Sequence, residues 1–160
     1  MQASRIDRIL WSLVAGSLLV GVVWIGANVF LIHRHRQAAR KMEVALLHLS
    51  ETVPEGLTED QWAFCLLRTW NLHSNYGDYP YVPVADLQRI ERALHSRIDA
   101  GADLTTIDWI WDEYLRACPR AVHYDRYRPT APDNKDEFDM GAHGNNPLSE
   151  WRDRHRRGSE

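Results

Sequence analysis

The sequence has none of the short motifs that mark the common catalytic folds. A phosphate-binding glycine loop, an HExxH zinc motif, a GxSxG nucleophile elbow and a dinucleotide-binding fingerprint are all missing. His73 has acidic and tyrosine residues near it in the sequence, but no nucleophile or second titrating partner can be identified beside it. We therefore predict a protein that is not an enzyme, with no catalytic residues and no cofactor.

Cysteine is scarce, with only Cys65 and Cys118 among 160 residues. The two show no CxxC spacing and have no histidine at ligand spacing, so a zinc site is not expected and we predict no metal. Each lies on the apolar face of a predicted helix, and we interpret both as buried thiols. The alternative, a single disulfide, would require an oxidising compartment.

Positive charge is scarce in the middle of the chain. Residues 42–118 carry five Lys and Arg against thirteen Asp and Glu, a net charge of −8, whereas residues 119–160 carry eight of each sign. An acidic domain is repelled by phosphates, so nucleic acid is not an expected partner. The alternation of polar and apolar residues that marks a strand is also missing, which predicts little sheet.

One long apolar run stands out against these absences. Residues 9–32 contain no charged side chain, and as a helix they would be about 36 Å long, enough to cross a bilayer. The run is longer than a signal-peptide core and ends in Phe30, Leu31 and Ile32, which offer no small-residue cleavage site. We predict a retained single-pass anchor.

The flanks of this run predict its orientation. Two arginines precede it, and four fixed positive charges follow it as what we call the basic collar: Arg34, Arg36, Arg40 and Lys41. We expect the basic collar to contact lipid headgroups, and we interpret His33 and His35 as part of it. The excess of charge after the run predicts a protein of the cell membrane whose C-terminal domain is cytoplasmic.

Small residues recur along the apolar run at helical spacing. Ser12 and Gly16 are four residues apart, and so are Ser17 and Gly21, a spacing that lets another helix approach closely. We predict that these positions pack against a neighbouring membrane helix. Asn28 has two interpretations, a hydrogen bond to a partner helix or a place near the membrane interface.

The remaining chain predicts an all-α fold: a transmembrane helix, a small helical domain and an extended polar C-terminal tail. We divide it into residues 1–36 (flank, anchor and collar), 37–57 (juxtamembrane helix and turn), 58–119 (helical domain) and 120–160 (tail, disordered or ordered by a partner). Within the domain, capping residues and apolar stripes predict helices near 58–73, 84–100 and 105–118, the first capped by Thr58 with Gln61 and the last by Thr105 or Thr106. Residues 71–83 are expected to form a loop with turns.

Aromatic residues are plentiful, with seven Trp and six Tyr. Because Tyr and Trp are enriched where partners meet, we predict a partner-binding set: His73, Tyr76, Tyr79, Tyr81, Trp109, Trp111 and Trp151. The first hypothesis for function is a non-catalytic accessory or scaffolding subunit of a larger membrane complex, such as a respiratory or photosynthetic one. Its partners would be other membrane subunits and the bilayer. The alternative is a membrane-tethered enzyme or ligand sensor that uses residues 73–81.

Overall fold

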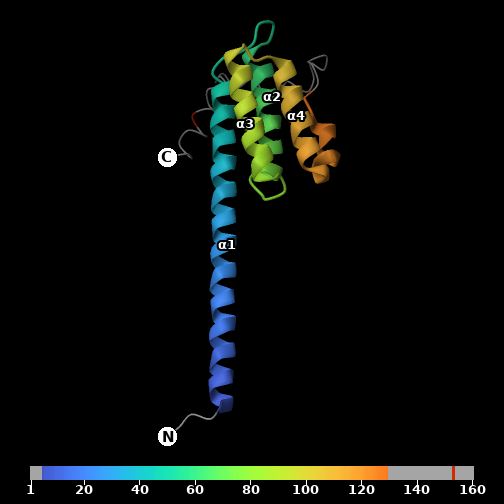
Figure 1. Ribbon diagram of the computed structural model, residues 1–160. Coiled ribbons are helices and arrows are strands. Elements are labelled where there is room, and N and C mark those ends of the chain that lie inside the picture. The colour runs from blue at the N-terminus through green and yellow to red at the C-terminus, as the bar shows by residue number, and fades with distance from the viewer. Residues whose placement is uncertain (1–4, 130–152, 154–160) are drawn as a thin grey trace. The chain divides into compact units, whose positions relative to one another are not determined.

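The protein is helical throughout the part that the structure describes. The computed structural model describes residues 5–129 and Asp153, with side chains from Trp11 onward. These residues form α-helices and two shorter helical segments, and no strand occurs among them: α1 (Arg5–Leu49), α2 (Glu59–Leu72), the π-helix η1 (His73–Gly77), α3 (Val84–Asp99), α4 (Leu104–Ala117) and the 3-10 helix η2 (Pro119–Tyr127) (Figure 1). The predicted fold class, one long apolar helix followed by smaller helices, is confirmed.

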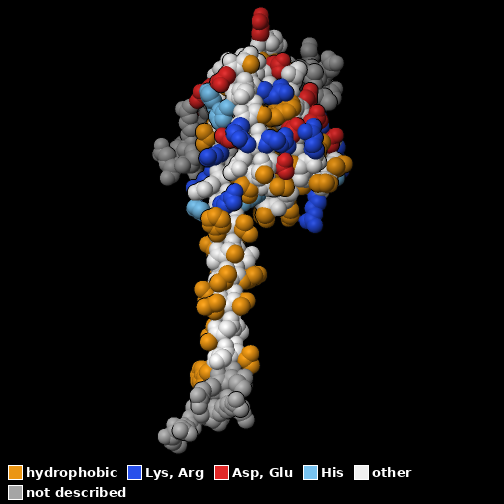
Figure 2. Space-filling model, viewed as in Figure 1, with side chains coloured by type: hydrophobic (Ala, Val, Ile, Leu, Met, Phe, Trp, Pro, Cys, Tyr) orange, Lys and Arg blue, Asp and Glu red, His pale blue; other side chains and the backbone are white. Residues whose placement is uncertain are grey.

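Contacts divide the chain after Arg34 into two compact units, residues 1–34 and residues 35–160. The first unit contains the apolar part of α1, which is long and apolar enough to cross a membrane, with no buried residue in its most apolar stretch. Figure 2 shows hydrophobic side chains along this part and charged side chains over the second unit. Trp24 is 67% exposed. A soluble core helix would bury such a surface, whereas a membrane span or a signal sequence would not.

Polar side chains in the apolar run bond to their own helix. The Ser17 hydroxyl donates to the Val14 carbonyl at 2.9 Å, and the Asn28 amide donates to the Trp24 carbonyl at 2.7 Å. A side chain that is bonded within its helix costs less to place in lipid. A Cβ added at Gly16 or Gly21 would meet no atom within 4 Å, so both positions are open.

The core of the second unit forms between the last turns of α1 and the helices that follow. An apolar stripe on the last turns of α1, made of Met42, Ala45, Leu46 and Leu49, is buried, from Met42 at 0% exposure to Leu49 at 2%. It packs with fully buried side chains of the other helices, among them Trp62, Leu66, Leu87, Ile90, Leu94, Ile107 and Trp111. Helix α4 contacts both α2 and α3, so residues that are distant in the sequence pack together in one hydrophobic core.

The first cap of the domain is the predicted one, and the last is not. Thr58 Oγ1 accepts from the Gln61 amide at 3.2 Å, and Gln61 Oε1 accepts from the Thr58 amide at 2.9 Å, which completes a capping box. Helix α4 is instead capped by Asp103, whose carboxylate accepts from the Thr106 amide at 3.2 Å. The predicted cap at Thr105 or Thr106 is therefore wrong, because Asp caps at least as well as Thr and stands two residues before Thr105 and three before Thr106.

The domain also extends beyond its predicted end. Residues 119–127 form η2 instead of the start of a tail, and Ala121 is fully buried. Arg128 follows η2 and donates to the Asp112 carboxylate at 2.8 Å, which ties the segment to α4. The boundary predicted at residue 120 is thus about ten residues early. Of the rest of the predicted tail the structure describes only Asp153, so Trp151 lies outside the described residues.

Both cysteines are buried free thiols. Burial, helped by the charge of Asp108, raises the pKa of Cys65 to about 11. The thiolate is the reactive form, and a pKa of 11 in place of 9.0 leaves roughly 100-fold less of it at pH 8.

We expect a maleimide-type reagent at pH 8 to label Cys65 at least about 100-fold more slowly in the native protein than in denaturant. A Cys118→Ala variant leaves Cys65 as the only thiol, so the rate can be followed by mass spectrometry. Equal rates in the native and denatured protein would contradict the buried position of Cys65.

Candidate functional site

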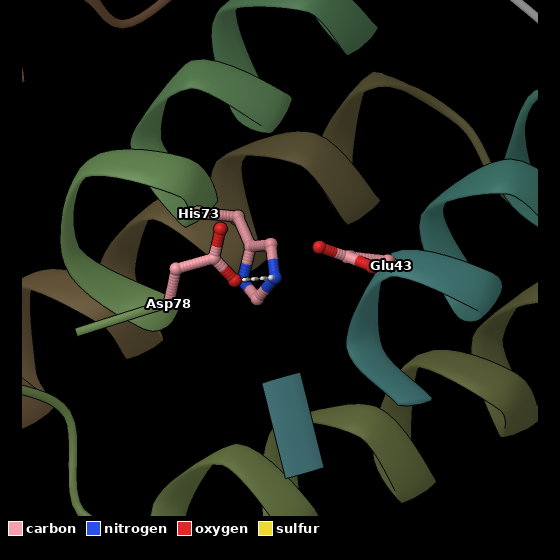
Figure 3. A group of neighbouring side chains, drawn as sticks. All are labelled: Glu43, His73 and Asp78. Atoms are coloured by element: carbon pink, nitrogen blue, oxygen red, sulfur yellow. Dashed lines mark ion pairs between the residues drawn. The ribbon is translucent and has the colours of Figure 1, made fainter. Parts of the chain in front are cut away.

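A group of polar side chains converges inside the second unit, and we call Glu43, His73 and Asp78 the His73 cluster. Glu43 comes from α1, His73 begins η1 and Asp78 follows it. In Figure 3 the imidazole ring lies between the two carboxyl groups. One ligand atom from each residue lies within 4.8 Å of the others. Such a convergence of titratable groups from separate elements is the kind of feature that marks functional sites.

The π-helix brings His73 and Asp78 together. The Asp78 amide donates to the His73 carbonyl at 3.1 Å, five residues back instead of the four of an α-helix. In an α-helix, residues five apart point about 140° away from each other. The predicted loop at 71–83 is therefore wrong in its first part, where α2 ends at Leu72 and η1 continues to Gly77. π-turns of this kind occur frequently at functional sites.

Gly77 allows the histidine ring to pack against the backbone. A Cβ at Gly77 would collide with Nδ1 of His73 and would lie 2.7 Å from its Cε1 and 3.1 Å from the Tyr114 hydroxyl. The Gly77 carbonyl accepts a hydrogen bond from His35 Nε2 at 2.7 Å. His35 is only 6% exposed, so its interpretation as part of the basic collar is wrong. It fastens α1 to the end of the π-turn.

His73 itself is fully buried, and only one of its two ring nitrogens makes a hydrogen bond. Its Nδ1 is 2.6 Å from the Tyr114 hydroxyl, and the two rings meet edge to face with centroids 6.0 Å apart. Its Nε2 makes no hydrogen bond of normal geometry, although the Ala39 carbonyl is close enough to the ring to favour its protonation, and it lies 3.7 Å from Asp78 Oδ1. Buried polar atoms are nearly always bonded, so an unpaired ring nitrogen calls for an explanation in function or strain.

Electrostatics keeps His73 neutral near pH 7. Burial lowers its pKa to about 4, while the Ala39 carbonyl opposes the shift and His35 adds to it. Burial also raises the pKa of Asp78, against the influence of His35, and raises that of Tyr114 well above its ordinary value. At neutral pH the ring therefore offers an uncharged nitrogen beside two carboxyl groups. A neutral imidazole and carboxylates are the ligands of divalent cations such as zinc.

Burial separates the members of the predicted partner-binding set. His73 and Trp111 are 0% exposed, so a partner cannot touch them, and their place in that set was wrong because both fill the interior of the domain. Tyr79 is 57% exposed and Tyr81 45%, and their rings lie 5.8 Å apart on one loop. We call these two residues the tyrosine surface.

The other predicted contact residues are surface residues with neighbours of their own. The Arg97 guanidinium lies 4.5 Å above the half-buried Trp109 ring, and the half-buried Tyr76 hydroxyl is 3.0 Å from His123 Nε2. All four residues of the basic collar are exposed. Their contact with lipid stays a prediction, as does helix packing at Ser12, Gly16, Ser17 and Gly21.

Sequence reasoning singled out His73 but missed Glu43, Gly77 and Tyr114 as its neighbours. One signal was available, since His35, Ala39 and Glu43 recur every four residues and so share a helix face. Two titratable residues on a face beside the buried Met42 stripe indicate a polar group in the core. No known protein family, curated protein or solved structure matches this chain.

Proposed function

We propose that this chain is a single-pass membrane protein that acts as a non-catalytic accessory subunit of a larger membrane complex. The observation that carries the proposal is the apolar surface of residues 11–32, almost all of it exposed. A soluble protein rarely exposes so large a continuous apolar surface. A bilayer covers such a helix, and the α-helix satisfies its own backbone there.

The orientation that we propose places the helical domain in the cytoplasm. The four charges of the basic collar outnumber the two arginines before the span, which favours retention of that side in the cytoplasm. The free thiols of Cys65 and Cys118 agree with a reducing compartment. The domain is then tethered on the cytoplasmic side and available to cytoplasmic parts of neighbouring subunits.

Two surfaces support an accessory role. In the span, Gly16 and Gly21 leave space that a neighbouring helix can enter. In the domain, the tyrosine surface exposes two adjacent aromatic rings, the residue type most enriched at protein interfaces. These surfaces belong to different units of the chain, so each supports contact with a partner independently.

Purification from native membranes in a mild detergent tests this function. The full-length protein is expected to run on a native gel within an assembly larger than its 18.6 kDa chain, with other membrane subunits present at fixed ratio. A Gly16→Leu or Gly21→Leu change should reduce this fraction several-fold, because leucine fills the space at the contact. Val22→Leu is the control, since residue 22 is already large and exposed. A single-protein species in every preparation would contradict the proposal.

The second candidate is a membrane-tethered ligand sensor that works through the His73 cluster. One observation favours it, the unpaired Nε2 of a fully buried histidine beside two carboxyl groups. In this case a His73→Ala change would abolish a ligand response. In an accessory subunit it would change only stability.

A further inference from the structure

We propose that Glu43, His73 and Asp78 bind one divalent transition-metal cation, with Zn²⁺ as the preferred ion. The proposal does not depend on the accessory role, because the three residues belong neither to the apolar span nor to the tyrosine surface. The site would give the domain a bound cation at the junction of α1 and η1.

The distances suit a metal centre. The donor atoms lie within 4.8 Å of one another, and the His73 Nε2 to Asp78 Oδ1 distance is 3.7 Å. Ligands bound to zinc at about 2.1 Å stand roughly 3.0–3.5 Å apart. The His73 and Asp78 pair is therefore nearly in place, and Glu43, whose carboxylate lies within 4.8 Å of both, would have to move closer to complete the site.

The histidine is oriented as a ligand. Its Nε2 is buried, has no hydrogen-bond partner and makes the contact with Asp78 that a dashed line marks in Figure 3. Its Nδ1 is engaged by the Tyr114 hydroxyl at 2.6 Å. Metal-bound histidines almost always donate their second ring N–H to a neighbouring acceptor, which fixes the tautomer that presents the other nitrogen to the metal. The Tyr114 hydroxyl would accept this hydrogen bond, and Gly77 packs against the ring.

The charge of the cluster calls for a cation. Glu43 and Asp78 place two carboxyl groups close to one imidazole, and like charges at this distance disfavour each other. Within the described residues, neither carboxylate has an ion pair with Lys or Arg. Asp78 Oδ1 lies 3.7 Å from His73 Nε2, a contact that is an ion pair only when the histidine is protonated. A divalent cation would neutralise both carboxylates and give the orphan Nε2 a partner in one step.

The donor set selects the kind of metal. One nitrogen and two carboxylate oxygens suit Zn²⁺, and more weakly Mn²⁺, whereas Ca²⁺ requires six to eight oxygens. The Asp78 side chain is 42% exposed, so solvent can reach the site and supply a water as fourth ligand. Three protein ligands with one open position is the arrangement of zinc sites that exchange a ligand.

Metal binding by the full-length protein in detergent micelles tests the proposal. The protein is prepared without a polyhistidine tag, stripped with EDTA and dialysed against Zn²⁺, and bound metal is counted by mass spectrometry. We expect one Zn²⁺ per chain, weaker binding of Mn²⁺, and no binding of Ca²⁺ at the same concentration. Zinc should also raise the midpoint of thermal unfolding, because it binds only the folded site.

Variants separate this site from surface binding. Asp78→Asn and Glu43→Gln keep the side-chain volumes and should each weaken Zn²⁺ binding by at least about tenfold, with no thermal shift left at the concentration that saturates the parent. The control is Glu91→Gln, which removes the carboxylate of a surface pair with His95, where the two atoms lie 3.4 Å apart. It should bind zinc as the parent does. No stoichiometric zinc, or equal binding by parent and Asp78→Asn, would overturn the proposal.

Discussion

Replacing Trp111 with alanine is expected to unfold the helical domain at moderate temperature. The side chain is 0% exposed, its Nε1 donates to Thr69 Oγ1 at 3.1 Å, and its ring stacks on Tyr124 with centroids 6.0 Å apart. Loss of a buried tryptophan costs about 3–5 kcal/mol, a large part of the roughly 5–15 kcal/mol that stabilises a small domain. Circular dichroism of the full-length protein in micelles should show a midpoint lowered by more than about 12 °C.

The adjacent tryptophan on α4 supplies the control. Trp109 is only half buried and packs under the Arg97 guanidinium at 4.5 Å. A Trp109→Ala change removes a cation–π contact and part of a ring, and it should cost less than about 1.5 kcal/mol. If both variants lose the same stability, the core position of Trp111 is not as described.

Gly77→Ala should destabilise the domain and disrupt the His73 cluster together. The new Cβ would lie 2.7 Å from His73 Cε1 and 3.1 Å from the Tyr114 hydroxyl, both on buried side chains that cannot swing into solvent. Overpacking of this kind costs about 1–3 kcal/mol, and the displaced ring also loses its bond to Tyr114. Thermal unfolding measures the first effect, and the near-ultraviolet circular dichroism of the tyrosine measures the second.

Gly16→Ala is the matched change at an open helical position. A Cβ there meets no atom within 4 Å, and alanine is the better helix former, so the midpoint should stay equal or rise slightly. Equal loss at both glycines would mean that close packing of His73 against Gly77 is not what destabilises the variant.

The elements that short-range rules govern could be predicted from the sequence. The Thr58 and Gln61 capping box depends on residues three apart, and the buried Met42 to Leu49 stripe depends on helical spacing alone. The cap of α4 lies at Asp103 and not at Thr105 or Thr106, because three polar residues within four positions compete for that role. The sequence alone does not show which of these residues caps the helix.

The candidate site could not be predicted, because long-range packing creates it. Glu43 and His73 are thirty residues apart, and Tyr114 is forty-one residues from His73. No short motif contains them, which is why the sequence predicted no metal. From the sequence, His35 was interpreted as part of the basic collar. Its hydrogen bond to the Gly77 carbonyl, which lies 42 residues away in the sequence, shows that it belongs to the interior of the domain.

The π-turn makes the site sensitive to chain length as well as to residue identity. Its five-residue hydrogen bond from Asp78 to His73 contains one residue more than an α-helical turn would. Removal of one residue among 74–76 would give the spacing of an ordinary α-helical turn and leave every side chain of the His73 cluster chemically intact. The carboxylate and the ring would still share a turn, but Gly77 would no longer face the ring and His35 would lose its acceptor. A deletion in η1 could thus disrupt the site even though Glu43, His73 and Asp78 are all retained, and a comparison of residue identities alone would not detect the loss.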